Sequence, residues 1–455
     1  MKLKYVLPYL LAVIPFATMS AKNIKDPVKP ITVIGLSNGV YNAVVDINGS
    51  GDYTSVQKAI DAAPEGSTKP FLIFIKNGSY NEVIVVPKEK TFLHLIGQDK
   101  NKTIIHYKLN VQSQPKEDSK WYQNDTAAWK YSVHNAEAKT YKFPGQVVTV
   151  NAQNFYAENI SFVNDWGVES QNGPQSLAMS TQADRIAFNN CVFRSFQDTW
   201  MTSTRGLNNR LYATNCWIEG AVDYFYGGGN AYVENSTFYN VRSGSVIVAP
   251  SHKEGTKWGY IFDHCIIDGN AAAGDGKLKL GRPWHDQPIA IYMNSTMKVI
   301  PHPEGWTDMG TIAKMFAEYN SRDVNGKLID LSNRRTWYVR RSDGQRVDGL
   351  TAALTAKDVE KYTYKNIIED ADGWNPRSFL ATAAKPTSLK ISAGNLSWKA
   401  ADKAAGYIIY KNNQVAGFSK APSYDISKTG SGNYFVQSVN EFGSLGKMSD
   451  TISIK

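Results

Sequence analysis

The sequence predicts an all-β protein: a right-handed parallel β-helix, or solenoid, followed by a small β-sandwich domain. Two observations lead to this prediction. A short motif recurs at intervals of twenty to thirty residues through the middle of the chain, and from about residue 385 short alternating strands replace it. At 455 residues the chain is also too long for one ordinary compact domain, which favours one large domain plus a small one.

The first 21 residues have the features of a signal peptide. Lys2 and Lys4 precede a short apolar stretch, and Ser20 and Ala21 are small residues suited to cleavage. The apolar stretch is too short to remain as a membrane anchor. We therefore expect an exported protein (periplasmic, cell-surface or secreted) without a membrane span.

Composition and charge limit the classes of partner that the protein is expected to bind. With 42% hydrophobic and 20% charged residues the chain is typical of a globular protein rather than a disordered or membrane-spanning one. Its formal charge is +9, or +7 without the two lysines of the signal (9 − 2). A basic exported protein can meet nucleic acid, an anionic membrane surface or an acidic polysaccharide. The sequence carries no nucleic-acid-binding motif, so an acidic polymer is the better fit and no nucleic acid is expected.

The repeat consists of a polar residue, then Asn or His, a small or apolar residue and two β-formers. It is found at residues 158–162, 189–193, 214–218, 234–238 and 263–267. Stacked coils bury an apolar face that a single coil cannot bury, so equivalent side chains lie above one another. Cys191, Cys216 and Cys265 hold equivalent positions, which predicts an internal stack of buried thiols rather than disulfides. Their spacing fits no metal site.

Upstream of the repeat, the strand pattern is weaker. Residues 70–75 and 82–86 are expected to be strands around a turn at Asn77-Gly78. Residues 115–145 are polar and carry several Trp and Tyr residues, and we expect them to form a long loop.

Two aspartates hold the same position in successive repeats. Asp198 follows Asn190 by eight residues, and Asp223 follows Asn215 by eight residues (198 − 190 and 223 − 215). Because adjacent strands are ~4.8 Å apart, the two carboxylates should be near neighbours on one face. Two close carboxylates repel, so one tends to keep its proton. Such a pair suits a nucleophile and a general acid.

The residues around this pair support that chemistry. Gln197 precedes Asp198, and Gln175 lies one coil earlier; amide donors beside a nucleophile suit an oxyanion site. Arg282 could hold a carboxylate ionised through paired hydrogen bonds. Trp284 could stack on a sugar face.

Motifs spread over residues 32–376 resemble those of pectin methylesterases (pectinesterases, carbohydrate esterase family 8). The matching segments are residues 49–57, 78–82, 175–179, 197–200, 223–227, 280–284 and 372–376, in the order of the family. Each motif alone is weak, whereas the ordered set is specific.

The resemblance implies a role for each residue of the site. Asp223 would attack the methyl-ester carbonyl of a galacturonate, and Asp198 would protonate the departing methanol and then deprotonate the hydrolytic water. Gln175 and Gln197 would stabilise the oxyanion, and Arg282 would orient Asp223. No metal or cofactor is implied.

The resemblance also implies a substrate groove for methyl-esterified homogalacturonan (pectin), in a protein expected to be a monomer. The residues expected to line this groove are Trp284, Tyr226, Phe225 and Trp200. Trp200, Tyr224 and Tyr226 depart from the family's usual residues at their positions, which puts the shape of the subsites in doubt.

The sequence leaves three other functions open. The same fold could carry a pectate lyase, a non-catalytic pectin binder, or an esterase or thioesterase for another substrate. In the domain organisation that follows from these patterns, residues 1–21 are the signal peptide and residues 30–378 the catalytic β-helix. Residues 385–455 resemble a fibronectin type III-like β-sandwich module.

Overall fold

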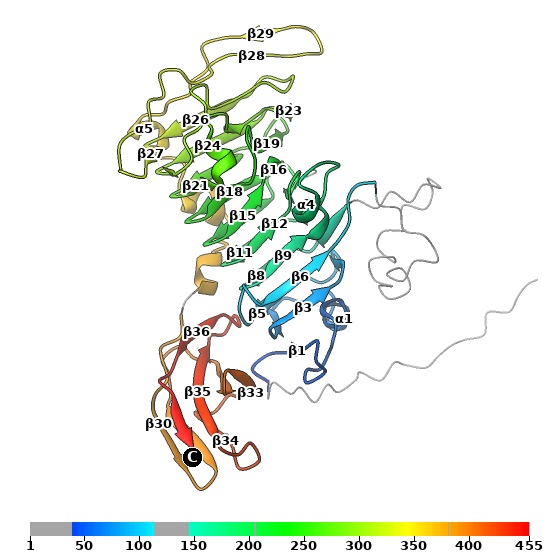
Figure 1. The fold of residues 1–455 in the computed structure, drawn as a ribbon, viewed down its shortest axis with the longest axis vertical. Coiled ribbons are helices and arrows are strands. Elements are labelled where there is room, and N and C mark those ends of the chain that lie inside the picture. Colours follow the sequence, from blue (N-terminus) through cyan, green and yellow to red (C-terminus); the bar gives the residue numbers. More distant parts are fainter. Residues whose placement is uncertain (1–38, 113–144, 204–205, 381, 455) are drawn as a thin grey trace, which may run out of the picture. The chain divides into compact units, whose positions relative to one another are not determined.

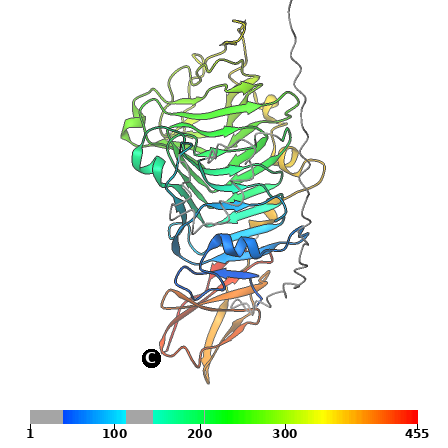
Figure 2. The same cartoon turned by 90° about the vertical axis from the view of Figure 1, so that its right-hand side faces the viewer.

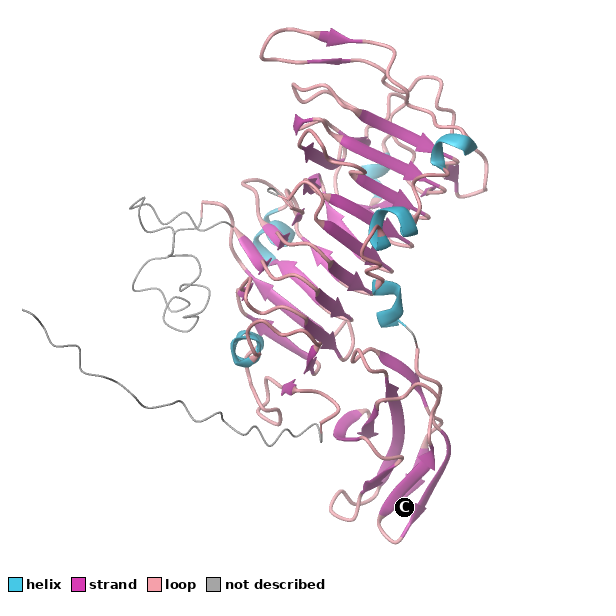
Figure 3. Ribbon diagram, turned by 180° about the vertical axis from the view of Figure 1, so that it is seen from behind, coloured by secondary structure: helices cyan, strands magenta, loops and turns pink. Residues whose placement is uncertain are grey.

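The computed structural model describes residues 39–112, 145–203, 206–380 and 382–454. Strands dominate these residues, and the helices are short (Figure 3). The predicted signal peptide lies outside the described residues, as does the predicted loop at residues 115–145 apart from its last residue.

Three parallel sheets run along the larger part of the chain, and each complete coil contributes one strand to each sheet in turn, whereas the first and last coils are incomplete (Figure 1). Sheet A consists of β1 (Ala43–Val45), β2 (Phe71–Ile75), β5 (Leu93–Gly97), β8 (Phe155–Glu158), β11 (Ile186–Asn189), β14 (Arg210–Thr214), β17 (Asn230–Glu234), β20 (Tyr260–Asp263), β24 (Ile289–Met293) and β26 (Met315–Tyr319). Sheet B consists of β3 (Gly78–Asn81), β6 (Thr103–Tyr107), β9 (Ser161–Asn164), β12 (Val192–Arg194), β15 (Trp217–Gly220), β18 (Thr237–Asn240), β21 (Ile266–Gly269), β25 (Thr296–Met297) and β27 (Arg322–Asp323).

Sheet C carries the two aspartates. Its strands are β4 (Ile84–Val86), β7 (Gln146–Val150), β10 (Leu177–Thr181), β13 (Trp200–Met201), β16 (Val222–Gly227), β19 (Val246–His252), β22 (Lys279–Gly281) and β23 (His285–Asp286). Parallel pairing of successive coils closes the β-helix around one continuous apolar core, as the sequence predicts.

The Asn or His of the repeat forms the turn from sheet A to sheet B. At these positions φ lies between +49° and +58°, a left-handed conformation that Asn tolerates better than most residues. The residues are Asn159, Asn190, Asn215, Asn235 and His264. Side-chain amides also bond along the stack, as in the 2.6 Å hydrogen bond that Asn190 Nδ2 donates to Asn159 Oδ1. The repeat is therefore a turn signal as well as a strand signal.

The stack of cysteines is confirmed. Cys191, Cys216 and Cys265 are free and buried, each one residue after the left-handed turn. Burial raises the pKa of all three thiols, so they stay protonated and act as small apolar side chains.

One detail of the first coils differs from the prediction. The strands at Phe71–Ile75 and Ile84–Val86 are present, but Gly78 begins β3 rather than a turn. A Cβ on Gly78 would come 2.9 Å from Ile47 Cγ2. The glycine therefore marks a close approach of two segments.

The helices are short and are not part of the three sheets that form the coils. They are α1 (Val56–Ala62), α4 (Asp165–Ser170), α5 (Ala356–Val359), the 3₁₀ helices η2 (Ala271–Gly274) and η4 (Pro376–Leu380), and the π-helix η3 (Lys365–Glu369). The apolar face of α1 packs on the first coils through Val56, Ala59 and Ile60 (Figure 2). None of these helices in the described residues has the length and apolar character needed to cross a bilayer.

The hairpin of β28 (Tyr338–Val339) and β29 (Arg346–Val347) follows the last coils. The chain then ends in two antiparallel sheets, a β-sandwich with its own core around Trp398, Tyr407 and Tyr434. One sheet contains β30 (Thr387–Ser392), β31 (Asn395–Lys399) and β34 (Ser423–Asp425), and the other β32 (Gly406–Lys411), β33 (Gln414–Ser419), β35 (Gly432–Val439), β36 (Leu445–Met448) and β37 (Ile452–Ile454).

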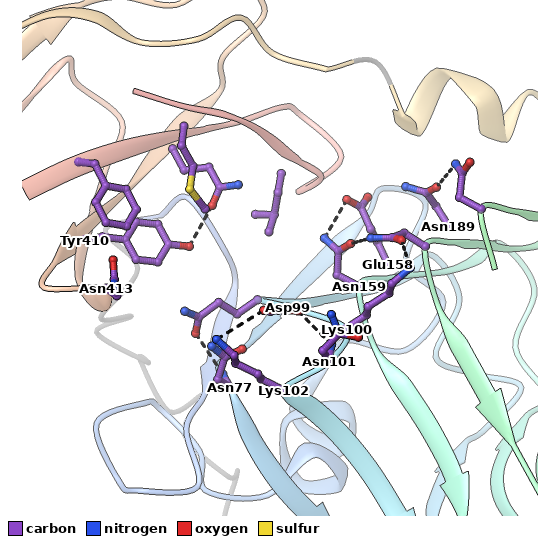
Figure 4. A pocket seen from close by; sticks show the side chains of 17 residues that line it. Asn77, Asp99, Lys100, Asn101, Lys102, Glu158, Asn159, Asn189, Tyr410 and Asn413 are labelled. Carbon is purple, nitrogen blue, oxygen red and sulfur yellow. Dashed lines mark hydrogen bonds and ion pairs between the residues drawn. The ribbon is translucent and has the colours of Figure 1, made fainter. Parts of the chain in front are cut away.

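A polar cleft of about 790 Å³ is lined by residues of the Asn turns and of β32, β35 and β36 (Figure 4). Its polar groups bond mainly to one another: Lys100 Nζ donates to Asn190 Oδ1 at 2.6 Å, and the Asn77 backbone amide donates to Gln98 Oε1 at 3.0 Å. These contacts hold the turns in place, so we assign no ligand to this cleft.

Candidate active site

Asp198 lies just before β13, and Asp223 lies on β16, the neighbouring strand of sheet C. A bridge pairs Gln197 with Val222, so the next residues, Asp198 and Asp223, stand at equivalent positions of neighbouring coils. The Asp198 amide donates to Val222 O at 2.9 Å. The equal offset in the repeat therefore predicted their placement correctly.

Both aspartates have left-handed backbones, with φ of 63° at Asp198 and 50° at Asp223. Between β16 and β19 the register shifts from Val222 to Phe225, so the nucleophile candidate sits in a bulge. Bulges next to active sites re-aim a side chain, and left-handed residues outside turns carry strain that the surrounding sheet must support.

Arg282 holds Asp223 with two hydrogen bonds. Its Nε donates to Oδ1 at 2.8 Å and its Nη2 to Oδ2 at 2.5 Å. The Asp223 side chain is only 8% exposed, so the pair is largely removed from water. Burial opposes the charge on Arg282, but the bonds to Asp223 raise the pKa of the guanidinium above its usual range. These two hydrogen bonds fix the plane of the Asp223 carboxylate.

The surroundings of Asp198, in contrast, favour its protonated form. Burial and the nearby charge of Asp223 raise its pKa to about 8, although hydrogen bonds from Tyr226 and Gln197 and the charge of Arg282 act the other way. At neutral pH Asp198 is therefore mostly protonated. Burial and Asp198 raise the pKa of Tyr226 well above 10, so Tyr226 stays a hydrogen-bond donor.

Two of the predicted groove residues are in the core instead. Trp200 and Phe225 are both 0% exposed, and they face each other in register inside the coils. The family resemblance had placed both residues in the substrate groove. The left-handed residue in each strand breaks the alternation of inward and outward side chains, which turns the side chain two positions later inward.

The other two predicted groove residues lie beside the aspartates. The rings of Tyr226 and Trp284 meet edge to face at 5.5 Å, in a small apolar cluster on the outside of sheet C. The sequence argument missed the remaining members of this cluster, which are Val111, Leu177, Met201 and Ala249. Met201 and Ala249 are the register partners of Tyr226, so a known register would have identified them.

Of the two predicted glutamines, Gln197 contacts the pair. Gln197 is hydrogen-bonded to Asp198, and its Oε1 lies where a Cβ on Gly173 would come within 3.3 Å. The Gln175 carbonyl accepts a 2.9 Å hydrogen bond from the Val111 amide, and its side chain is half-buried. In the described ranges, no group of three or more His, Cys, Asp or Glu residues could hold a metal ion.

Beyond Trp284 the surface continues into a cleft of about 730 Å³. Residues 284–287 line one part of it, and residues 309–311 and 340–342 line another. Two arginines, Arg340 and Arg341, and two acidic residues, Glu254 and Asp286, are among the residues that line it.

A family model described as Pectinesterase matches residues 42–130 and 122–371 of this sequence. The chain belongs to the pectinesterase family. Membership makes it a carboxylic ester hydrolase that acts on the methyl esters of pectin, and it disfavours the same-fold lyase.

Pectinesterases of known sequence extend the match. A pectinesterase of Petunia integrifolia is 30% identical over 356 residues, which cover 75% of this chain and 83% of the relative. Pectinesterase 31 of Arabidopsis thaliana is 32% identical over 58% of this chain and 76% of its own length. The chain spans about half (48%) of a probable pectinesterase/pectinesterase inhibitor, number 58, from Arabidopsis thaliana.

Solved pectin methylesterases share the fold. The carrot enzyme aligns with a TM-score of 0.57 at 24% identity, over 73% of this chain and 94% of that one. The enzyme of Erwinia chrysanthemi aligns with a TM-score of 0.55 at 22% identity, over 74% and 98%.

Proposed function

We propose that this pectinesterase removes methyl esters from the galacturonate units of pectin with Asp223 as the nucleophile and Asp198 as the general acid and base. The observation that carries the proposal is the split of the pair into a carboxylate clamped by Arg282 and a neighbouring acid whose pKa is raised to about 8. A similar fold binds an oligosaccharide: one solved pectin methylesterase is in complex with a hexasaccharide.

In the first step an oxygen of Asp223 attacks the ester carbonyl carbon, and the carbonyl π electrons move to its oxygen. When the tetrahedral species collapses, the bond to the methoxy group breaks. Asp198 gives its proton to that oxygen, and methanol leaves an acyl-enzyme on Asp223. The two-bond contact with Arg282 presents the attacking oxygen in one orientation.

The amide groups of Gln175 and Gln197 would donate hydrogen bonds to the oxyanion. Neutral donors aimed at the developing charge stabilise the transition state more than the ester. In the second step Asp198, now ionised, takes a proton from water, and the hydroxide displaces Asp223 from the acyl carbon. This returns both carboxyl groups to their starting states and leaves a free galacturonate.

The pH profile tests the role of Asp198. Because the protonated form is needed for methanol to leave, kcat/KM should fall about tenfold per pH unit above about pH 8. Tyr226→Phe removes a hydrogen bond that lowers this pKa, so the alkaline limb should move to higher pH. Methanol release measured from pH 5 to 10 gives the profile.

Tyr319→Phe is the matched control, since Tyr319 lies in sheet A. It should leave the profile unchanged. An alkaline limb that stays in place in Tyr226→Phe would remove Asp198 from the role of acid.

Product analysis separates the remaining functions. Hydrolysis gives methanol and a saturated chain, whereas a lyase gives unsaturated ends, and a binder gives neither. A panel of pectin, acetylated pectin and simple thioesters defines the acyl group accepted. Unsaturated product without methanol would contradict the proposal.

The cleft beyond Trp284 is proposed to bind a galacturonate that has already lost its methyl group. Arg341 lies across Gly310, where an added Cβ would come 3.3 Å from its Nε, and among the described residues Arg341 has no ion-pair partner. Arg340, in contrast, pairs with Asp343 at 3.0 Å. A free guanidinium beside a groove suits a sugar carboxylate.

Arg341→Gln should therefore lower kcat/KM on partly demethylated pectin by about two- to fivefold, the value of one exposed charge contact. Activity on fully methylated pectin should change much less. Arg340→Gln serves as the control, because Arg340 is engaged by Asp343. Equal losses on both substrates would argue against a carboxylate contact.

The domain division is part of the proposal. We infer a catalytic domain at residues 30–378 and a fibronectin type III-like module at residues 385–455, in an exported monomer. The two antiparallel sheets of the C-terminal part, with three and five strands, support a module of this kind.

A further inference from the structure

The motif at residues 78–82 has a structural role that leaves one residue unexplained. Tyr80 is 0% exposed in the core, and the Glu82 carboxylate accepts hydrogen bonds from the amides of Val56 and Gln57 at the start of α1. Ser79 directly precedes Tyr80 and faces outward from β3, where it is exposed. Packing and capping therefore account for its neighbours but not for Ser79.

Ser79 is the first member of a hydrogen-bonded chain. Its Oγ lies 2.9 Å from His106 Nε2, and His106 Nδ1 lies 2.6 Å from Asp165 Oδ2. Both distances are within the range of nucleophile–base and base–carboxylate contacts. The three residues come from β3, β6 and the first turn of α4, so adjacent coils hold them in place.

The carboxylate defines the proton positions. An ionised Asp165 only accepts hydrogen bonds, so Nδ1 of His106 carries the proton and Nε2 is free to accept from the Ser79 hydroxyl. This is the tautomer that a general base needs. The His106 and Asp165 side chains are 21% and 26% exposed, so a ligand can reach the chain from solvent.

The edge of sheet B offers donors for an oxyanion. β3 is its terminal strand, and the amides of Gly78 and Glu82 donate toward β6, to Lys102 O and His106 O. In a parallel strand alternate residues point the same way, so the amides of Ser79 and Asn81 point to the free edge. An oxyanion formed on Ser79 lies next to its own amide, as such sites require.

We propose that Ser79, His106 and Asp165 form a second, independent esterase centre on sheet B that cleaves small exposed esters, such as an O-acetyl group on a sugar. Ser79 Oγ attacks the acyl carbon as its proton passes to His106 Nε2. The proton then goes to the alkoxide, and the alcohol leaves. Water, deprotonated by His106, releases the acid and restores Ser79.

This centre differs from the aspartate pair in position and in selectivity. It lies on sheet B, whereas Asp198 and Asp223 lie on sheet C. Because its side chains are partly exposed, water screens their charges. We therefore expect slow hydrolysis with little selectivity among esters, fastest on activated ones.

The test uses the full chain with Asp223→Asn, so that the first centre is silent. Multiple turnovers of 4-nitrophenyl acetate should persist, and adding Ser79→Ala should lower that rate at least tenfold. His106→Gln should do the same, and Asp165→Asn should reduce it less. Ser170→Ala, another exposed serine, is the control and should change nothing.

A fluorophosphonate probe adds a second readout. Peptide mass spectrometry should find the phosphonyl group on Ser79, and His106→Gln should abolish the labelling. Hydrolysis that survives Ser79→Ala unchanged, or a label elsewhere on the chain, would overturn the proposal. Circular dichroism of the Ser79→Ala variant shows that a loss of activity is not a loss of fold.

Discussion

Asp223→Asn should reduce kcat for methanol release by about 10⁴-fold while pectin binding persists, as is found when an enzyme loses its nucleophile. The amide has the shape of the carboxylate but no charge, so it cannot form the acyl-enzyme. Its NH₂ group would also face an N–H donor of Arg282, so one of the two hydrogen bonds from the guanidinium would be lost. Initial rates and pull-down on immobilised pectin measure the two properties.

The matched control for this variant is Asp268→Asn. Asp268 lies on β21 of sheet B, apart from the proposed site, and forms a 2.9 Å ion pair with Lys298, which follows β25. Its replacement should leave kcat within twofold. Methanol release that survives in Asp223→Asn would assign the nucleophile to another residue.

Trp200→Ala should destabilise the protein by about 3–5 kcal/mol, the usual cost of truncating a buried Trp. The indole is 0% exposed, stacks on Phe193 at 4.0 Å and donates from Nε1 to Thr181 Oγ1 at 3.2 Å. Removing it leaves a cavity in the core directly below the aspartate pair. Denaturant unfolding measures the loss.

Trp284→Ala gives the opposite pattern. Trp284 lies on the outer surface against Tyr226, so its loss should cost less than about 1 kcal/mol and raise KM for pectin instead. If the Trp200→Ala protein had normal stability but a raised KM, Trp200 would belong to the groove, where the family resemblance had placed it.

The contrast between these two tryptophans shows where reasoning from sequence succeeds. The repeat gave the β-helix, the cysteine stack and the pairing of Asp198 with Asp223, because each depends only on equal offsets from an Asn turn. Residues at equal offsets stay at equivalent positions even where the strands are irregular, provided that both coils share the irregularity.

Whether a side chain points into the core or outward was harder to predict. Its direction depends on the conformation of every residue between the Asn turn and that side chain. The left-handed backbones at Asp198 and Asp223 reverse the alternation of inward and outward side chains. The residue type does not predict such a conformation, because Asp adopts it in some places and ordinary strand geometry in others. The family resemblance had placed Trp200 and Phe225 in the groove, whereas both are buried in the core.

The Ser79–His106–Asp165 chain could not be found from sequence either. Its members are 27 and 59 residues apart, and only the register of β3, β6 and β9 brings them together.

A carboxyl-¹³C NMR titration of aspartate-labelled protein tests the central claim, that one carboxyl of the pair is protonated at neutral pH. The resonance that is missing from the Asp198→Asn spectrum belongs to Asp198, and it should titrate near pH 8. In Asp223→Asn its midpoint should fall, because the neighbouring charge is gone. A midpoint near 4 for Asp198 in the unaltered protein would contradict the account.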